Sequence, residues 1–378
     1  MRVVHLIKAT RISGAERHLL ILLTALRRLN VDAHLLLLVE PNNLMDDLIA
    51  EATARKIPVQ RVLIQSDADP RVVNRLRESL RSLRPDILHT HLIHADVYGF
   101  VAGKLAGVPR IVTSRHNDDP FRRRLPIRVT HRAIWQGVHA GIAISDAIRR
   151  FLIEVEGAPE KKLHVVRYGL EFERVTPQTI ESARQELRAE LELPEGTFLF
   201  GMACRLVAQK GVSDALHAFA SIAQEDAHCH FVIAGDGDLL AQLLAETQEL
   251  GIAERVHFLG WRDDVQQVLA ALDVFLMPSL WEGFGLVLIE AMSKRIPVIG
   301  TRVSAIPEIV QDGESGLLVP PRDRAALAAA MQILLQDRAL RRYMGLLGED
   351  RVESVFSVQR MAEETLAIYQ QIQPKGQS

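Results

Sequence analysis

The sequence predicts an α/β protein made of two doubly wound domains, and three observations support this. Short apolar runs of strand length alternate with amphipathic stretches of helix length along most of the chain. Several apolar runs end in glycine-containing turns that lead into a helix, an order typical of parallel sheets. A chain of 378 residues with 48% hydrophobic content is long enough for two domains of ordinary size. We expect the two domains to face each other across a cleft.

The domain boundaries are predicted from prolines, glycines and charged stretches that interrupt the sequence. Residues 1–170 form the first predicted domain, residues 171–355 the second, and residues 356–378 a last helix. The charged stretch from 171 to 195 is interrupted by Pro177 and Pro194, which is typical of a linker followed by a helix.

The first predicted domain opens with a buried strand at residues 3–7, followed by Ser13-Gly14-Ala15-Glu16 and an amphipathic helix. A strand, a glycine turn and a helix start can bring backbone amides to a phosphate, so Gly14 is a candidate phosphate contact. Further strands are expected at residues 33–39, 57–64, 85–91, 108–116 and from 140, where Ser145 is a good N-cap for the next helix. Helices are expected at 71–83 and 97–105.

Histidines gather near the end of one predicted strand, at His89, His91 and His94. We reject a metal site there, because no carboxylate or cysteine at ligand spacing completes the set. Strand alternation instead places His89 and His91 on one face and Thr90 on the other. The next strand ends at Ser114-Arg115-His116, where the polar groups of an open α/β sheet gather. A surface histidine in a loop is the alternative for His116.

A basic amphipathic segment follows at residues 121–135, with five arginines among apolar residues and Pro126 as a helix interruption. It suits either an anionic membrane face or the solvated flank of a helix. Nucleic acid is not an expected partner, because aromatic residues are too sparse for a stacking surface.

In the second predicted domain, Arg205 and Lys210 follow a strand end and precede a helix. Two cations there can clamp a diphosphate, arginine as a fork and lysine as a point charge. The later Asp236-Gly237-Asp238 has the form of a D-x-D, which holds a divalent metal in another glycosyltransferase fold. Trp261 and Arg262 end another strand.

The stretch from Asp273 to Gly300 is central, because it predicts a strand, a glycine loop, a helix and a second strand. A helix beginning at Gly285 or Leu286 aims free N–H groups at the loop and can seat a phosphate. Glu290 lies on the same helix face as Leu286, one turn in, and can accept hydrogen bonds from a ribose. Glu282 lies on the loop. An ordinary strand–helix–strand unit with solvated glutamates is the alternative.

Glu282 and Glu290, with Phe284-Gly285 between them and Ile306-Pro307-Glu308 later, resemble the paired-glutamate motif of the retaining glycosyltransferases of family 4. The resemblance covers nearly the whole chain. It implies the GT-B fold, with two Rossmann-like domains and a C-terminal helix that crosses back to the first domain. It also implies that Asp236-Gly237-Asp238 is a turn that holds no metal. Three segments depart from the usual pattern: Ser13 stands for a glycine, Ser114-Arg115-His116 for Thr-x-His, and Arg167-Tyr168-Gly169 for Pro-Asn-Gly. Arg115 is therefore a candidate acceptor-phosphate contact.

The resemblance also implies a reaction, the transfer of a sugar from a nucleotide diphosphate-sugar, UDP- or GDP-linked, to an acceptor hydroxyl with retention and without a metal. The first domain would bind the acceptor and the second the donor. The predicted catalytic residues are Glu282 and His116. The predicted donor-binding residues are Gly14, Arg205, Lys210, Arg262, Phe284, Gly285, Leu286, Val287 and Glu290. Sugars and lipid-linked or other hydroxyl compounds are the expected acceptors, in glycan, glycolipid or cell-envelope polysaccharide synthesis.

Three other functions are alternatives to glycosyl transfer. A sugar phosphorylase or a sucrose- or trehalose-type synthase would share the fold and the glutamate pair. A nicotinamide dehydrogenase would need G-x-G-x-x-G after the first strand, where only one glycine stands. A non-catalytic sugar-binding scaffold would be expected to lose the cations and glutamates that are all present here.

Charge and cysteine content bear on location. Residues 1–170 hold 27 Lys and Arg against 17 Asp and Glu, while the remainder is acidic and the net charge is −2. A basic half favours an anionic partner such as a membrane surface. The two cysteines, Cys204 and Cys229, suit buried thiols in a reducing compartment. With no leader or long apolar run, we expect a cytoplasmic protein, soluble or peripheral on the inner face of the membrane.

Overall fold

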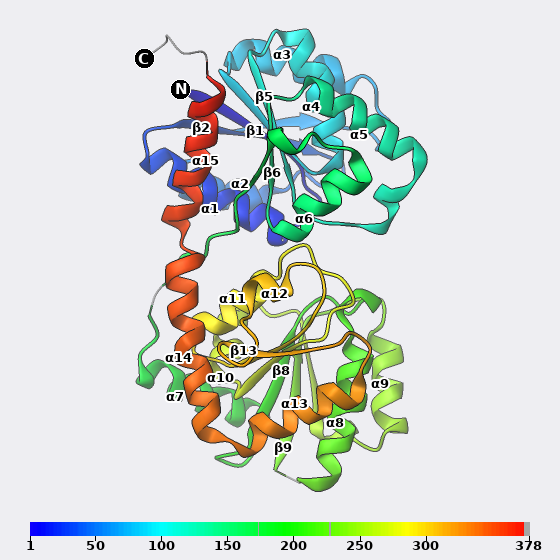
Figure 1. The fold of residues 1–378 in the computed structure, drawn as a ribbon, viewed down its shortest axis with the longest axis vertical. Helices are drawn as coiled ribbons and strands as arrows, with labels where there is room; N and C mark the ends of the chain where they lie inside the picture. The colour runs from blue at the N-terminus through cyan, green and yellow to red at the C-terminus, as the bar shows by residue number, and fades with distance from the viewer. Residues whose placement is uncertain (173, 227, 374–378) are drawn as a thin grey trace. The chain divides into compact units, whose positions relative to one another are not determined.

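The computed structural model describes residues 1–172, 174–226 and 228–373. The chain divides into two compact units. The N-terminal unit comprises Met1–Glu171 together with the C-terminal helix that follows Ser357, and the C-terminal unit comprises Phe172–Phe356. Each unit is a parallel sheet between helices, so the predicted α/β class is confirmed (Figure 1).

The N-terminal unit is built on seven parallel strands in the order β3-β2-β1-β4-β5-β6-β7. Its strands are β1 Arg2–Lys8, β2 Asp32–Val39, β3 Val59–Leu63, β4 Ile87–His91, β5 Arg110–Arg115, β6 Ala140–Ala143 and β7 Leu163–Val165. Its α-helices are α1 Gly14–Arg28, α2 Asp46–Ala54, α3 Val72–Leu83, α4 Leu92–Ala106, α5 Leu125–Gly137, α6 Asp146–Phe151 and α15 Val358–Ile372. Ser145 caps α6 as predicted, because its hydroxyl accepts a hydrogen bond from Ile148 N.

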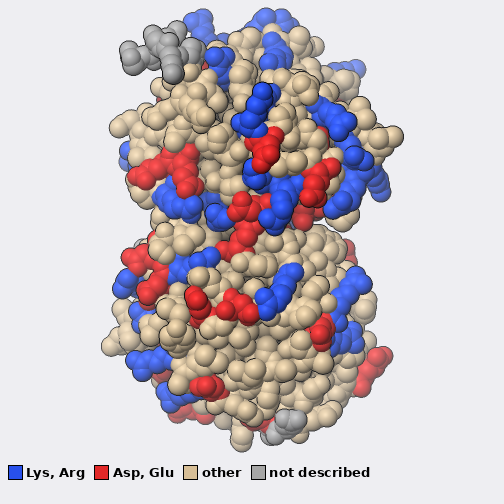
Figure 2. Space-filling model, in the orientation of Figure 1, with Lys and Arg blue, Asp and Glu red and all other residues tan. Residues whose placement is uncertain are grey.

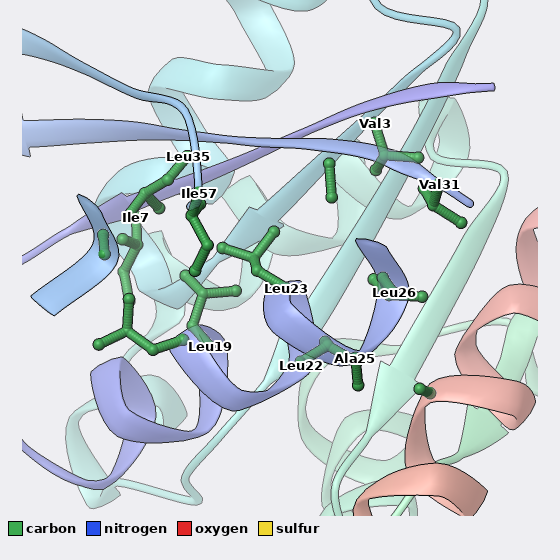
Figure 3. Packing of buried hydrophobic residues seen from close by; sticks show 14 of the residues in the cluster. Val3, Ile7, Leu19, Leu22, Leu23, Ala25, Leu26, Val31, Leu35 and Ile57 are labelled. Carbon is green, nitrogen blue, oxygen red and sulfur yellow. The ribbon is translucent and has the colours of Figure 1, made fainter. Parts of the chain in front are cut away.

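Two hydrophobic layers cover this sheet, one on each face, which is the arrangement parallel sheets require. On one face the predicted apolar stripe of α1 packs on β1 and β2, and Figure 3 shows Leu19, Leu23 and Leu26 pointing toward this layer. The opposite layer holds Leu76 and Leu80 of α3 together with residues of α4. The prediction of a doubly wound unit from the alternation of strands and helices is therefore confirmed for this unit.

The C-terminal helix α15 belongs to the N-terminal unit, as expected of a helix that crosses back. Met361 and Tyr369 of α15 are buried in the same layer as α1. Leu170 forms an isolated β-bridge with Ser357, just before the helix starts. Figure 1 shows α15 running beside α1.

The C-terminal unit has six parallel strands in the order β10-β9-β8-β11-β12-β13. The strands are β8 Phe198–Ala203, β9 Cys229–Ala234, β10 Val256–Gly260, β11 Val274–Met277, β12 Val298–Thr301 and β13 Gly316–Val319. The α-helices are α7 Pro177–Glu190, α8 Val212–Glu225, α9 Leu240–Glu249, α10 Val265–Ala271, α11 Leu286–Ser293, α12 Ile306–Ile309, α13 Arg324–Gln336 and α14 Arg338–Val355. Its central strands β8 and β11 pair directly, so the loops after them are neighbours.

The basic segment 121–135, for which a membrane face and a solvated helix flank were the two predicted alternatives, is only partly exposed. Pro126 lies in the first turn of α5 and so begins that helix rather than interrupting it. Arg122 is buried and pairs with Glu156, so it cannot face a membrane. Figure 2 shows basic and acidic side chains interspersed on the displayed face of each unit. Among the described helices, none has both the length and the apolarity needed to cross a bilayer.

Candidate functional site

Two loops of the C-terminal unit are joined by hydrogen bonds at the carboxyl ends of β8 and β11. Leu280 donates its backbone N–H to the Gln209 carbonyl at 2.8 Å, and the Gln209 amide donates to the Trp281 carbonyl at 2.9 Å. Lys210 Nζ forms an ion pair with the Glu282 carboxylate, both side chains being mostly buried. The structure thus brings together two of the predicted site residues that are 72 positions apart.

Gly211 lets these loops approach. It has a φ of +66°, and a Cβ added there would lie 2.1 Å from the Pro278 carbonyl oxygen. A side chain would therefore push the loop after β8 away from the loop after β11 and disturb the Lys210–Glu282 pair.

We expect Gly211→Ala to lower the free energy of unfolding of the C-terminal unit by about 3 kcal/mol, combining left-handed backbone strain with a steric clash. Gly251→Ala is the matched control, because Gly251 has a φ of +68° and a Cβ there meets nothing within 4 Å. The control should lose only about 1 kcal/mol from the backbone term. Equal losses in urea unfolding of the two variants would refute the close approach.

The helix α11 starts as predicted. Gly285 is its N-cap with a φ of +101°, a conformation that favours glycine. No described residue accepts a hydrogen bond from the backbone N–H of Leu286 or Val287, so both donors point out of the helix start. Glu290 follows one turn later and is half-buried. The Phe284 side chain is buried against Phe356, so any ligand contact of Phe284 must use its backbone.

The other predicted donor-binding residues differ in their surroundings. Arg205 is exposed, and its side chain makes no ion pair with any described residue. The predicted D-x-D segment is a turn, in which Leu206 N donates to the Asp236 carbonyl at 2.9 Å and so supports the Arg205 loop. Arg262 instead pairs with Glu190 and Asp264, and these two hydrogen-bonded carboxylates raise the pKa of its guanidinium. The structure does not place Arg262 with Lys210 and Glu282.

Gly14 and His116 lie in the N-terminal unit. Gly14 is exposed and is the first residue of α1, after a capping box in which Ser13 and Glu16 bond each other reciprocally. Ser13, which replaces a glycine of the usual pattern, therefore has a structural role. His18, one turn later, is buried and stacks on Tyr168 with ring centroids 3.9 Å apart. Nothing in the sequence marks His18, and Tyr168 is marked only as part of Arg167-Tyr168-Gly169, which stands in place of Pro-Asn-Gly.

His116 is almost wholly buried, so the alternative of a surface histidine is wrong. Its Nδ1 lies 2.5 Å from the Tyr168 hydroxyl, and its Nε2 lies 3.0 Å from His91 Nδ1. Burial lowers the pKa of His116 to about 3, so the ring is neutral at physiological pH.

Arg115 is not accessible to an acceptor, contrary to the expectation that it contacts an acceptor phosphate. Its guanidinium is fully buried and pairs with Asp96 at 2.5 Å and with Glu156 at 3.3 Å. Side-chain alternation along β5 explains this, because Arg115 and His116 leave the strand in different directions.

One cluster among the described residues could offer ligands to a metal ion, formed by ring nitrogens of His5, His89 and His91 within 4.8 Å of one another. All six of these nitrogens already have hydrogen-bond partners. A metal ion could bind only by breaking these bonds. His89 and His91 share a face as predicted, while Thr90 turns away and bonds Asp96.

The buried histidines predict acid lability of the N-terminal unit. Burial lowers the pKa values of five of them, His5, His18, His89, His91 and His116, and the unfolded chain would titrate near 6.5. Their stabilising effect is present above pH 6.5 and is lost as the pH falls toward about 3. Each of these histidines lowers the free energy of unfolding by up to about 1.4 kcal/mol for every pH unit below 6.5. Because a domain is stable by only about 5–15 kcal/mol, we expect the N-terminal unit to unfold near pH 5.

The fluorescence of buried Trp135 in a Trp261→Phe/Trp281→Phe background reports on this unit. In that background, His18→Phe should flatten the pH dependence by about one proton. Stability that stays constant between pH 6.5 and 5 would refute the prediction.

Comparisons with known proteins bear on what these sites do. Residues 12–174 match the family model described as Glycosyltransferase Family 4, and residues 183–350 match the model described as Glycosyl transferases group 1. The N-acetyl-alpha-D-glucosaminyl L-malate synthase of Bacillus anthracis is 30% identical over 310 residues, covering 80% of this chain and 78% of that protein. The chain belongs to the family 4 glycosyltransferases.

Two further similarities help to describe this glycosyltransferase. The UDP-Gal:alpha-D-GlcNAc-diphosphoundecaprenol alpha-1,3-galactosyltransferase of Escherichia coli is 28% identical, covering 70% of each chain. The crystal structure of Anabaena Alr3699/HepE in complex with UDP and glucose superposes with a TM-score of 0.85 at 22% identity, covering 98% of this chain and all of that one. The similarity in structure confirms the GT-B fold. The chain is thus a family 4 glycosyltransferase in fold and in sequence.

Proposed function

We propose that this glycosyltransferase takes a UDP- or GDP-linked sugar as donor, binds it on the C-terminal unit and transfers the sugar with retention. The observation that carries this proposal is the Lys210–Glu282 ion pair in the loop that leads to the free amides of Leu286 and Val287. A cation and two unpaired N–H groups suit the diphosphate of such a donor. The solved relative is described in complex with UDP and glucose, which supports the same class of donor.

Each predicted residue then has a chemical role. Lys210, Arg205 and the α11 amides stabilise the negative charge of the leaving diphosphate. Glu290 accepts hydrogen bonds from the ribose, and Glu282, oriented by Lys210, accepts from sugar hydroxyls. Arg262 lies at the end of β10, where we place the nucleobase.

The reaction is proposed as a displacement on one face of the sugar. The bond from the anomeric carbon to the diphosphate oxygen breaks, and the bond to the acceptor oxygen forms on the same face. The acceptor's proton passes to the leaving phosphate oxygen. No step uses a metal ion, because the cation and the amides supply the charge stabilisation.

The N-terminal unit is proposed to bind the acceptor. Gly14 and His116 belong to that unit, and their contacts with donor or acceptor stay predictions. The similar galactosyltransferase is named for a diphosphoundecaprenol acceptor, which favours a lipid-linked hydroxyl compound in glycan or cell-envelope synthesis.

The anomeric configuration of the product tests this function. The enzyme would be incubated in EDTA with UDP- and GDP-sugars, and the released nucleotide and the new anomeric signal would be followed by proton NMR. We expect release of one nucleotide and a product with the donor's configuration. Inversion would contradict the mechanism, and turnover only after inorganic phosphate is added would favour a phosphorylase.

We also propose that the protein works in the cytoplasm and binds an anionic membrane surface through α5. Leu125 and Val129 are 69% and 61% exposed, next to exposed Arg124 and Arg128. Such a face combines insertion of apolar side chains with attraction to anionic lipids.

Vesicle sedimentation tests this contact. Arg124→Glu/Arg128→Glu should reduce binding to vesicles with anionic lipid, at about 1 kcal/mol for each basic residue lost. Leu105→Ser, at an exposed leucine of α4, is the control and should bind like the wild type. Equal binding of the charge-reversed variant would refute the proposal.

A further inference from the structure

A continuous chain of buried hydrogen bonds runs through the N-terminal unit from the loop after β7 to helix α15 and back to β5. In order, its members are Tyr168, His116, His91, His5, Tyr369, His89 and Ser114. All are buried, none more than 8% exposed. Register places the strand members side by side, since His5 of β1 pairs with His89 of β4, and His91 pairs with Ser114 of β5.

The hydrogen bonds of this chain all run in the same direction from one histidine to the next, because every histidine in it is neutral. Burial lowers the pKa values of His5 and His116 to about 3, and those of His89 and His91 also lie well below the usual range. Burial also raises the pKa of Tyr369, which keeps its hydroxyl protonated. A neutral imidazole has one N–H donor and one acceptor nitrogen. Each histidine that accepts from one neighbour must therefore donate to the next.

Two proton arrangements satisfy every bond in this chain when the Tyr369 hydroxyl donates to one of its two histidines. In one, all four histidines carry the proton on Nε2 and Tyr168 donates to His116. In the other, all four carry it on Nδ1 and His116 donates to Tyr168. His5, His91 and His116 are bonded directly to one another, so a change in the tautomer of one of them changes the tautomers of the other two.

The distances favour the arrangement with protons on Nε2. His116 Nδ1 lies 2.5 Å from the Tyr168 oxygen, and His89 Nδ1 lies 2.6 Å from the Tyr369 oxygen. Both are shorter than usual N–H···O bonds and suit a phenol that donates. The distance of 3.3 Å from His5 Nε2 to the Tyr369 oxygen is long, as for an imidazole N–H that donates.

We propose that Tyr369, His5 and His91 are positioning residues that hold His116 as the Nε2–H tautomer, with its Nδ1 accepting from the Tyr168 hydroxyl. The C-terminal helix α15 then controls, through three hydrogen bonds, which nitrogen of His116 carries the proton. The catalytic meaning of this control rests on the proposed role of His116, whereas the tautomer itself does not.

Removing the Tyr369 hydroxyl makes a distinct prediction. With protons on Nε2, His5 would be left with a buried N–H donor that has no acceptor. With protons on Nδ1, His5 would be left with an unpaired lone pair, which is the less costly defect. Tyr369→Phe should therefore move the His116 proton from Nε2 to Nδ1. His5→Phe breaks the next link and should do the same, because His91 then loses its acceptor.

Nitrogen NMR of histidine side chains in the 378-residue protein tests the inference, since the ¹⁵N shift of a ring nitrogen shows whether that nitrogen is protonated. A His116→Asn variant assigns the His116 signals. We expect Nε2–H in the wild type and Nδ1–H in Tyr369→Phe and in His5→Phe. Tyr343→Phe, at a tyrosine 53% exposed on α14, is the control and should match the wild type.

An Nδ1–H tautomer in the wild type, or an unchanged tautomer in both broken-chain variants, would overturn the inference. Turnover separates it from the proposed function. If the His116 tautomer switches in Tyr369→Phe, and kcat falls about tenfold while the KM for the donor is unchanged, both the positioning chain and the proposed role of His116 are supported. If the tautomer switches while His116→Asn keeps full turnover, the positioning chain stands and the proposed role of His116 falls.

Discussion

Replacing Lys210 with methionine is expected to lower kcat/KM for the nucleotide-sugar by 10²–10³-fold, the usual effect of removing a charged group that stabilises a leaving anion. The variant should remain folded, because the methionine stem fills the space of the lysine stem between the loops. Steady-state kinetics with a saturating acceptor measures the effect. Lys294→Met, just after the last residue of α11, is the matched control and should keep wild-type activity.

A double variant separates two explanations of that loss. Lys210→Met leaves the mostly buried Glu282 carboxylate without its cation, which by itself disturbs the loop. Lys210→Met/Glu282→Gln removes the charge as well. If activity returns in the double variant, Lys210 only neutralises Glu282, and its proposed contact with the diphosphate is wrong.

Glu156→Gln is expected to lower the free energy of unfolding of the N-terminal unit by about 3–5 kcal/mol. Glu156 is buried, accepts hydrogen bonds from Arg122 and Trp135 at 3.0 Å, and pairs with Arg115. The amide removes the negative charge and leaves two buried guanidiniums with Asp96 alone. Urea unfolding followed through Trp135 measures the change.

Glu154→Gln is the control for this prediction, since Glu154 is exposed on the same helical turn. It should change the free energy of unfolding by no more than about 0.5 kcal/mol.

The pH dependence of the stability that Glu156 contributes has a defined sign. Burial works against ionisation of Glu156, but Arg115 and Arg122 outweigh it and lower its pKa to about 2. Its contribution is therefore present above about pH 4.5 and lost as the pH falls toward 2. Equal losses of unfolding free energy in Glu156→Gln and Glu154→Gln would contradict the account.

The fold was largely predictable, because its signals are local. Strand runs such as residues 33–39 are closed by turns, and α1 carries its apolar stripe at helical spacing. The start of α11 was also predictable, since Gly285 ends a loop and good helix formers follow. Lys210 and Glu282 were each selected as site residues from such local patterns.

Contacts between distant segments could not be predicted in the same way. The sequence shows Arg115 and Arg122 as charges but not their buried partners, which come from α4 and from the turn at Glu156. Alternation placed His89 and His91 on one face, yet only the pairing of β1, β4 and β5 brings in His5 and Ser114. Gln209, whose amide joins the two loops, carries no local pattern that would mark it.

Calorimetric titration with UDP and GDP in EDTA tests the central claim, a metal-independent nucleotide-sugar site on α11 and its preceding loop. The titration compares the wild type with Glu290→Ala and with Glu314→Ala, an exposed glutamate of the same unit. We predict that one nucleotide binds the wild type and Glu314→Ala alike. Binding to Glu290→Ala should be at least tenfold weaker, about 1.4 kcal/mol. Failure of both nucleotides to bind, or equal binding to Glu290→Ala, would contradict the account.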